Sequence, residues 1–249
     1  MATPYGNEKR QKMFKFKHSL LKSGILKGKT DIHCHVLPGV DDGSPDLPHS
    51  LDLLDYMEHD LGFKAAWLTP HVMQGNTNTA AHLKPIFEEL TRRYDGGMRL
   101  QLSSEYMMDA GFNERLNTDP LRLGEHHLLV ETSYMSGPND LNDILLSVWH
   151  KDMKPLIAHP ERYMYMSEDD YRNLKGLGYE FQLNLLSLSG YYGMRPRLVA
   201  ESLLEEGFYD NVGTDLHHLD RFEDFLYDLK LTRSQLDMLE QLFDNNERL

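Results

Sequence analysis

The feature that most restricts the fold of this chain is a repeated alternation of short apolar stretches with amphipathic helical stretches. Seven β-like stretches follow one another between Thr30 and Thr214, and helical spacing of apolar residues follows each of them. The stretch at 46–61 is typical, with leucine and methionine at intervals of three or four. Such a repeat predicts an α/β fold with a parallel sheet, whether open or closed into a barrel.

Length and charge limit the number of domains and the partners. The chain has 249 residues, which suits one large domain, and a net charge of −13, which would repel a nucleic-acid backbone. Residues 1–30 contain eight Lys or Arg against one Glu, so this segment carries +7 and the remainder −20. We predict a basic helical extension at 1–29 and a single barrel-sized α/β domain at 30–249. The extension is either a solvated end or a contact for an anionic membrane surface or an acidic partner.

Targeting signals and cysteines point to the cytosol. The sequence shows neither the apolar core and cleavage site of a secretory signal nor an apolar run of about 20 residues that would span a bilayer. Its single cysteine, Cys34, allows no intrachain disulfide and suits a reducing compartment. We therefore expect a cytoplasmic protein without a transmembrane segment.

Residues that bind metals well stand just past the ends of the expected strands. Six of the seven strands end in His, Asp or Glu, and the carboxyl edge of a parallel sheet is where active sites form. Only the sixth strand differs, and it contains Gln182 and Asn184. The residues at the six strand ends are His33 and His35, His71, Glu105, Glu131, His159, and Asp215 with His217.

The first strand end is the richest of these positions. His33 and His35 are two residues apart, so in a strand they project from the same face, while Cys34 points to the opposite face. The pair Asp41 and Asp42 follows on the next turn, and spacing alone does not choose between these two carboxylates. Two imidazoles and a carboxylate suit a divalent metal, although a pair of surface histidines on an edge strand is an alternative.

The whole set is too large for one zinc ion. With Asp42 it comprises five imidazoles and four carboxylates, whereas one zinc takes about four ligands. Two or three divalent ions with open positions for water and substrate fit better. Three divalent ions against four carboxylates would leave a positive charge, which a phosphate monoester would neutralise.

Taken in order, the motifs resemble those of the PHP (polymerase and histidinol phosphatase) superfamily, and most closely its bacterial metal-dependent protein-tyrosine phosphatases linked to capsule and exopolysaccharide synthesis. The motifs are DIHCHVLPGVDDG, LTPH, SSE, LVE, AHPERY and GTDLH, within about residues 30–220. The resemblance implies a distorted seven-stranded (β/α) TIM-like barrel (the PHP fold) and three divalent metals, often Mn²⁺, with Fe, Mg or Zn as alternatives. The implied ligands are His33, His35, Asp42, His71, Glu105, Glu131, His159, Asp215 and His217.

The resemblance also implies two arginines that contact phosphate. The arginine of the HPER motif falls on Arg162, and a structural ion pair is the alternative reading of this residue. The second family arginine has its nearest match in Arg221, although the spacing from the last ligand is short by about one residue. His218 stands where the family usually has Asn.

These residues predict a phosphatase in which a metal-bound water attacks phosphorus while metals and Arg162 spread the charge of the transferring group. A cysteine phosphatase is rejected, because the motif Cys-x5-Arg is missing around Cys34, where Val40 occupies the arginine position. The resemblance implies a phosphotyrosine protein substrate, such as a tyrosine autokinase. The alternatives are a small-molecule phosphoesterase, such as a histidinol-phosphate phosphatase, and a non-catalytic partner stabilised by metal.

Overall fold

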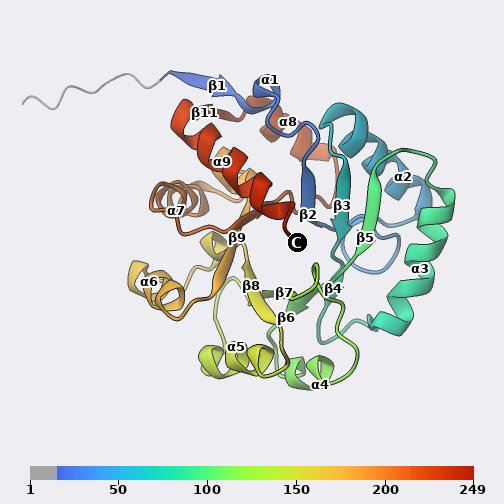
Figure 1. Ribbon diagram of the computed structural model, residues 1–249, viewed down its shortest axis with the longest axis vertical. Coiled ribbons are helices and arrows are strands. Elements are labelled where there is room, and N and C mark those ends of the chain that lie inside the picture. Colours follow the sequence, from blue (N-terminus) through green and yellow to red (C-terminus); the bar gives the residue numbers. More distant parts are fainter. Residues whose placement is uncertain (1–15) are drawn as a thin grey trace, which may run out of the picture.

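The computed structural model describes residues 16–249 (Figure 1). Most of its strands form two parallel ladders, ordered β2-β3-β5 and β10-β9-β8-β7-β6-β4. The strands of these ladders are β2 (Thr30–Cys34), β3 (Ala65–Leu68), β4 (His71–Val72), β5 (Arg99–Leu102), β6 (Glu105–Met107), β7 (His127–Glu131), β8 (Lys154–Ala158), β9 (Glu180–Asn184) and β10 (Asn211–Gly213). The parallel α/β class predicted from the sequence is confirmed.

The two ladders continue into each other along the chain. Thr69 and Pro70 divide one extended segment into strands β3 and β4. Ser103 and Ser104 divide the next extended segment into β5 and β6. Proline has no backbone N–H to donate to a ladder, which accounts for the break at Pro70. The ladder partners nevertheless remain the same, since β3 pairs with β5 and β4 pairs with β6. Each interrupted stretch therefore occupies one position in the strand order.

Hydrogen bonds also connect the first strand with the end of the last. The backbone N–H of Asp215 donates to the carbonyl of His33 at 2.7 Å, and that of His35 donates to Leu216 at 2.8 Å. The buried carboxylate of Asp31 adds to this junction by accepting from the backbone N–H of Thr214 at 3.0 Å and from its hydroxyl at 2.5 Å. Strands β2 and β10 are thus neighbours, as a barrel-like arrangement requires.

Helices lie outside the strands and separate them from solvent (Figure 1). Side-chain caps fix where several of them begin: the oxygens of Asp46, Thr79, Ser167 and Thr232 accept from backbone N–H groups of the following turn. The helices are α1 (Leu20–Ser23), α2 (Leu47–Asp55), α3 (Ala80–Arg93), α4 (Phe112–Leu116), α5 (Leu141–Trp149), α6 (Glu168–Gly176), α7 (Met194–Glu205), α8 (Asp220–Asp228) and α9 (Arg233–Asn246), with short helices η1 (Tyr56–Asp60), η2 (Pro160–Arg162) and η3 (Leu185–Ser189).

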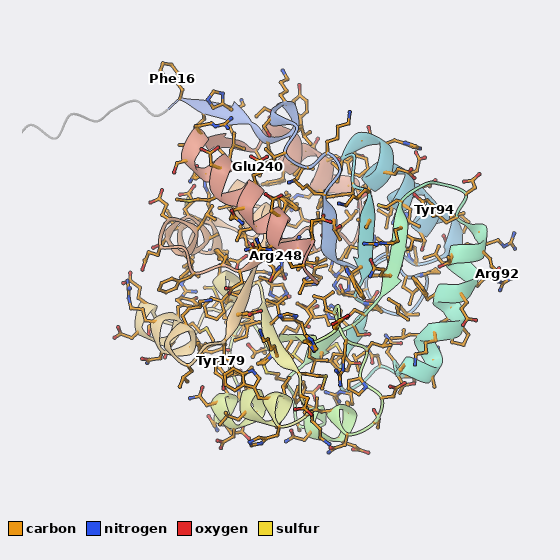
Figure 2. The ribbon with its side chains drawn as sticks, in the orientation of Figure 1. Phe16, Arg92, Tyr94, Tyr179, Glu240 and Arg248 are labelled. Carbon is orange, nitrogen blue, oxygen red and sulfur yellow. The ribbon has the colours of Figure 1, made fainter. Side chains whose placement is uncertain are left out.

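The hydrophobic core has two parts. A large cluster lies between the strands and the helices, and a small one lies among the strands, formed by Ile32, Trp67, Leu123, Leu129, Leu156 and Ala158. The C-terminal residue Leu249 packs against this inner cluster, and the labelled Arg248 lies close to the centre of the strand arrangement in Figure 2. The strands therefore surround packed side chains, as in TIM-like barrels, and leave function to the loops at their ends.

The N-terminal segment differs in part from the predicted helical extension. Residues 1–15 lie outside the described part of the chain. Lys17–Ser19 form strand β1, which pairs antiparallel with β11 (Lys230–Thr232), and only Leu20–Ser23 are helical. The free edge of β11 offers backbone partners to the strand, and burial of Leu20 fixes α1 on the body. The boundary between extension and domain remains a prediction. No helix within residues 16–249 is long and apolar enough to cross a membrane.

Candidate metal centre

The structure gathers all nine predicted ligands at the carboxyl edge of the parallel strands. Every one of them belongs to at least one of four groups whose ligand atoms lie within 4.8 Å of one another. These groups are His35 with Asp42, His71 and His217; His33 with His35 and Glu105; His33 with His159 and Asp215; and His71 with Glu105 and Glu131. The nine side chains therefore lie together, as the sequence predicted. Their role as metal ligands remains a prediction.

Three of the nine, His33, His35 and Asp215, form what we call the β2–β10 wall. Both histidines are fully buried, and each uses Nδ1 to contact an oxygen: His33 reaches Gln182 Oε1 at 2.8 Å and His35 reaches Asp41 Oδ2 at 2.9 Å. In neutral rings these contacts place the proton on Nδ1 and leave Nε2 as an acceptor. The two Nε2 atoms face each other at 3.1 Å, where two lone pairs repel unless a cation or a proton lies between them.

The carboxylate of Asp215 is divided between two tasks. Its Oδ2 accepts from Arg162 Nη1 at 2.7 Å, from Asn184 Nδ2 at 2.7 Å and from the Tyr192 hydroxyl at 3.3 Å. Its Oδ1 lies instead 3.4 Å from His33 Nε2 and 3.3 Å from His35 Nε2. Three donors thus hold one oxygen in place and aim the other at the imidazoles, as supporting hydrogen bonds do around metal ligands.

A second group, His71, Glu105 and Glu131, forms the β4–β7 wall. His71 Nδ1 lies 3.0 Å from both Glu105 Oε2 and Glu131 Oε1. None of these three atoms has a hydrogen bond of acceptable geometry, although all three are buried. Unpartnered buried polar atoms destabilise a protein by about 1–3 kcal/mol each. One nitrogen and two carboxylate oxygens converging in this way fit a divalent cation.

His159 connects the two walls. Its Nε2 lies 2.8 Å from Glu105 Oε1, and its ring is 5.6 Å from the ring of His33. His159 and Asp215 both have positive φ values, 33° and 54°, which are uncommon outside glycine. Strain of this kind persists where the surroundings determine the backbone, and it concentrates at functional sites. The turns after β8 and β10 are therefore shaped to direct these two side chains inward.

The structure separates the roles of the two adjacent aspartates. Asp41 accepts from His35 Nδ1 and also, at 2.9 Å, from the backbone N–H of His71, so it orients two predicted ligands. Asp42 instead places Oδ1 3.4 Å from His71 Nε2 and 3.5 Å from His217 Nε2. Asp42 is mostly exposed, and it lies where a ligand at the solvent side of the cluster would be.

Two glycines allow the β2–β10 wall to form. A Cβ atom at Gly43 would lie 2.0 Å from the carbonyl oxygen of His35, and one at Gly213 would lie 2.5 Å from His33 Cβ. Neither position accepts a side chain without moving a predicted ligand. Gly43 of the DIHCHVLPGVDDG motif and Gly213 of the GTDLH motif are thus required by close packing against the histidines.

The charges of the cluster influence one another strongly. Burial alone would raise the pKa of the Glu105 carboxyl, but His33 and His159 hold it well below its usual range. Burial and the neighbouring His35 would lower the pKa of His71, but the nearby carboxylates of Glu105 and Glu131, each 3.0 Å from its Nδ1, outweigh them and raise it to about 10. The buried carboxylate of Glu105 is therefore ionised at neutral pH, and protonated imidazoles or bound cations must balance its charge.

The two predicted arginines lie in different environments. Arg162 is joined to the cluster through Asp215, and its Cζ lies 4.2 Å and 4.0 Å from the ring centroids of Tyr134 and Tyr192. Arg221 is exposed at the start of α8, where its Cζ lies 5.8 Å from the ring of Tyr191 and 5.2 Å from that of Phe225. No described contact joins Arg221 to a predicted ligand.

Cys34 has the environment of a packing residue. It is fully buried in the large core cluster, and its thiol donates to the carbonyl of Trp67 at 3.4 Å. Burial, together with the charge of Asp31, raises the pKa of this thiol well above its usual value. A thiol that resists ionisation is a poor nucleophile, in agreement with the expected packing role.

An open cavity of about 490 Å³ leads to the cluster. Asp42, His71 and Glu131 line it together with Met107 and Tyr134. Sequence reasoning missed Tyr134, and it gave no role in the site to Asp41, Gln182 or Asn184. Gln182 and Asn184 gave a detectable signal, because two polar side chains at positions i and i+2 of a buried strand share one face. Nothing in the sequence indicated that Tyr134 would reach Arg162.

A cluster of imidazoles and carboxylates at the carboxyl edge of a TIM-like α/β fold is typical of metal-dependent hydrolases. Within that class, a family model described as "Capsular polysaccharide synthesis, CpsB/CapC" matches residues 29–228, and the chain belongs to this family. The family predicted from the sequence motifs is thereby confirmed.

Curated relatives are tyrosine phosphatases. The chain is 24% identical over 201 residues to tyrosine-protein phosphatase YwqE of Bacillus subtilis, covering 76% of this chain and 77% of YwqE. It is 25% identical over 210 residues to tyrosine-protein phosphatase CpsB of Streptococcus agalactiae, covering 79% and 86%. These relatives have the activity that the motifs predict.

Solved structures support the fold. A structure from the pair YwqE of Bacillus subtilis and CpsB of Streptococcus pneumoniae, described as unique metal-dependent tyrosine phosphatases, superposes with a TM-score of 0.74 at 23% identity, covering 88% of this chain and 93% of that one. Histidinol phosphate phosphatase of Lactococcus lactis, solved with zinc, L-histidinol and phosphate, gives a TM-score of 0.53 at 13% identity, covering 86% and 93%. At these identities the likeness concerns the fold alone.

Proposed function

We propose that this protein is a metal-dependent protein-tyrosine phosphatase that uses its nine clustered histidines and carboxylates to hold the metals. The observation that carries the proposal is the convergence of all nine side chains in a member of the CpsB/CapC family. Both curated relatives described above are tyrosine-protein phosphatases. A purely structural metal site would be closed, whereas here a cavity reaches Asp42, His71 and Glu131.

We propose three divalent ions, with Mn²⁺ as the first candidate and Fe, Mg and Zn as alternatives. The four ligand groups share His33, His35, His71 and Glu105, which suits ions that lie close together. Mixed nitrogen and oxygen donors accommodate each of these metals. When bound, such ions supply an activated water at neutral pH and neutralise charge on the phosphate.

The protein's own contribution to phosphate binding centres on Arg162. Its Nη1 is fixed by Asp215, and within residues 16–249 its other guanidinium nitrogens make no described hydrogen bond. The planar fork of an arginine matches two phosphate oxygens better than a lysine does. Arg162 would therefore bind the equatorial oxygens of the transferring group, while the Asp215 contact prevents the guanidinium from rotating away.

The leaving group explains why the site can do without a dedicated acid. The phenol of tyrosine has a pKa of about 10, so it departs as a phenolate far more readily than an alkoxide does. The buried, weakly acidic thiol of Cys34 rules out a cysteinyl-phosphate route. Attack by water in line with the phenolate oxygen, with Arg162 on the equatorial oxygens, is the reaction these residues favour.

The substrate is a phosphotyrosine protein, and the family resemblance favours a tyrosine autokinase that controls capsule or exopolysaccharide synthesis. A location in the cytoplasm is part of the same proposal. The rim of the cavity is open and carries Met73, Met107 and Tyr134, so a phosphotyrosine on a protein surface can enter without the whole substrate being enclosed. The same proposal includes a role in substrate binding for Arg221, which is exposed at the start of α8.

Hydrolysis assays test this function. Phosphotyrosine peptide, phosphoserine peptide and histidinol phosphate are each incubated with the protein, with Mn²⁺ and with a chelator. We expect turnover of the phosphotyrosine peptide with Mn²⁺ and its loss with the chelator. Turnover of histidinol phosphate alone would assign the protein to small-molecule phosphoesterases. Absence of any turnover in protein shown to contain metal would favour a non-catalytic role.

A further inference from the structure

Arg162 packs against two tyrosine rings that the proposed reaction does not by itself explain. Its Cζ lies 4.2 Å from the centroid of the Tyr134 ring and 4.0 Å from that of the Tyr192 ring. Either ring alone would stabilise the cation through its quadrupole. The two tyrosines, however, come from different loops and have different surroundings, which indicates different tasks.

Tyr192 is the inner member of the pair. Its hydroxyl accepts from Asn184 Nδ2 at 3.0 Å and donates to Asp215 Oδ2 at 3.3 Å, so both polar functions are satisfied inside the protein. Tyr192 is absent from the lining of the cavity at the cluster. These contacts describe a positioning residue that holds Arg162 and Asp215 in a fixed relation.

Tyr134 is the outer member and reaches the cavity. It lines the cavity beside His71 and Glu131, it is 36% exposed, and its ring centroid is 5.9 Å from that of His159. Within residues 16–249 its hydroxyl makes no described hydrogen bond, whereas its ring forms part of the cavity wall. An aromatic wall at this place has no evident task in holding metal.

The loop that carries Tyr134 is fixed to the segment that carries Arg162. The backbone N–H of Met164 donates to the carbonyl of Tyr134 at 2.7 Å, and the hydroxyls of Thr132 and Tyr165 are 2.7 Å apart. A Cβ atom at Gly137 would meet the Tyr165 ring at 2.5 Å, so this loop packs directly on the same segment. The position of the Tyr134 ring relative to the guanidinium is therefore set by the fold.

We propose that Tyr134 is a specificity-determining residue whose ring forms the wall against which the aromatic ring of an aryl phosphate packs. The inference rests on the proposed phosphatase function and deepens it. When Arg162 binds the phosphate, the organic group of the ester lies beside the Tyr134 ring, because that ring packs against the same guanidinium. A flat phenyl group gains an offset or edge-to-face contact there, which an alkyl chain does not.

The test compares two phosphate esters whose leaving groups have similar acidity but different shape, phenyl phosphate and hexafluoroisopropyl phosphate. Wild type, Tyr134→Phe and Tyr134→Leu are assayed with Mn²⁺. Tyr192→Leu is the matched variant, because it removes the other tyrosine ring that packs against Arg162. We expect Tyr134→Leu to lower kcat/KM for phenyl phosphate by about tenfold more than for the alkyl ester, mainly through KM. Tyr134→Phe should keep the wild-type preference, because it keeps the ring.

The outcomes separate this inference from the proposed function. Tyr192→Leu should lower both activities to the same extent, since it acts through Arg162 and Asp215. An equal loss on both esters in Tyr134→Leu would show that Tyr134 only positions Arg162 and would overturn the inference while leaving the phosphatase intact. Failure of wild type to hydrolyse either ester would instead overturn the proposed function. Metal content and inhibition by inorganic phosphate, measured for each variant, report whether the cluster itself is preserved.

Discussion

The two walls of the metal centre are built on different principles. In the β2–β10 wall each side chain has a partner outside the cluster: Gln182 for His33, Asp41 for His35, and three donors for one oxygen of Asp215. In the β4–β7 wall one atom each of His71, Glu105 and Glu131 is buried without a hydrogen bond. The first wall is preorganised by the fold, whereas the second is left for a cation to complete.

The difference follows from where the walls lie in the strand order. Strand β2 is flanked by β3 and by the end of β10. Strand β9, which pairs with β10, supplies Gln182 and Asn184. In the β4–β7 wall, Glu131 ends β7, but His71 and Glu105 lie on β4 and β6, which are two and three residues long and begin after breaks in the ladder. A wall on short strands has fewer neighbouring side chains to satisfy its polar atoms.

The largest expected effect comes from removing a ligand of the preorganised wall. His33→Ala deletes a side chain shared by two of the four ligand groups. We expect phosphatase turnover to fall to background and bound metal to be lost together, measured by activity assay and elemental analysis. His127→Ala is the matched control, because His127 is a partly buried histidine at the amino end of β7, paired with Glu180 and away from the predicted ligands. A fully metallated, active His33→Ala protein would contradict the ligand assignment.

The β4–β7 wall makes stability depend on metal. Because unpartnered buried atoms gain a partner when a cation binds, Mn²⁺ at about 100 times its dissociation constant should stabilise the protein by about 2.7 kcal/mol. Thermal unfolding with Mn²⁺ and with a chelator measures this gain. Glu131→Gln should lose most of it, whereas Glu180→Gln, which changes a carboxylate bonded to His127, should keep it. An equal gain in both variants would show that Glu131 is not a ligand.

A smaller effect is expected from removing Gln182, the hydrogen-bond partner of His33 in the β2–β10 wall. Gln182→Leu leaves the Nδ1–H of His33 buried without an acceptor and frees the ring to change its orientation. Loss of such a supporting partner typically weakens metal binding by about 10- to 100-fold. Titration with Mn²⁺ should show this range, and Gln182→Glu, which retains an acceptor oxygen, should restore tight binding. Unchanged affinity in Gln182→Leu would mean that this wall is not held by its outer partners.

The site was predictable from the sequence to the extent that strand ends gather at one edge. His71, Glu105 and Glu131 could be placed together because parallel strands align their carboxyl ends. The hydrogen-bond partners of the predicted ligands could not be predicted in this way. Gln182, for example, contacts His33 from 149 positions further along the chain, and no periodicity encodes such a separation. Spacing alone likewise did not separate Asp42 from Asp41, whose contacts differ only in the folded turn.

Elements fixed by long-range contacts were also beyond prediction. The strand at Lys17–Ser19 exists because β11 offers it an edge, and local sequence favoured a helix there instead. The second expected strand ends before Pro70 as predicted, but the sequence did not indicate that the ladder resumes in β4, which pairs with β6. Tyr134 belongs to a loop whose position depends on hydrogen bonds to Met164 and Tyr165.

The smallest expected effect concerns the other face of β2. Cys34 lies between His33 and His35 but packs into the outer core, where a smaller side chain leaves only a small cavity. Cys34→Ala should therefore lower the free energy of unfolding by about 1 kcal/mol and leave metal content and kcat/KM near wild type. Denaturant unfolding measures the free energy, while elemental analysis and steady-state assays measure the metal content and kcat/KM. A large loss of activity in Cys34→Ala, with the metal still bound, would mean that the two faces of this strand are not functionally separate.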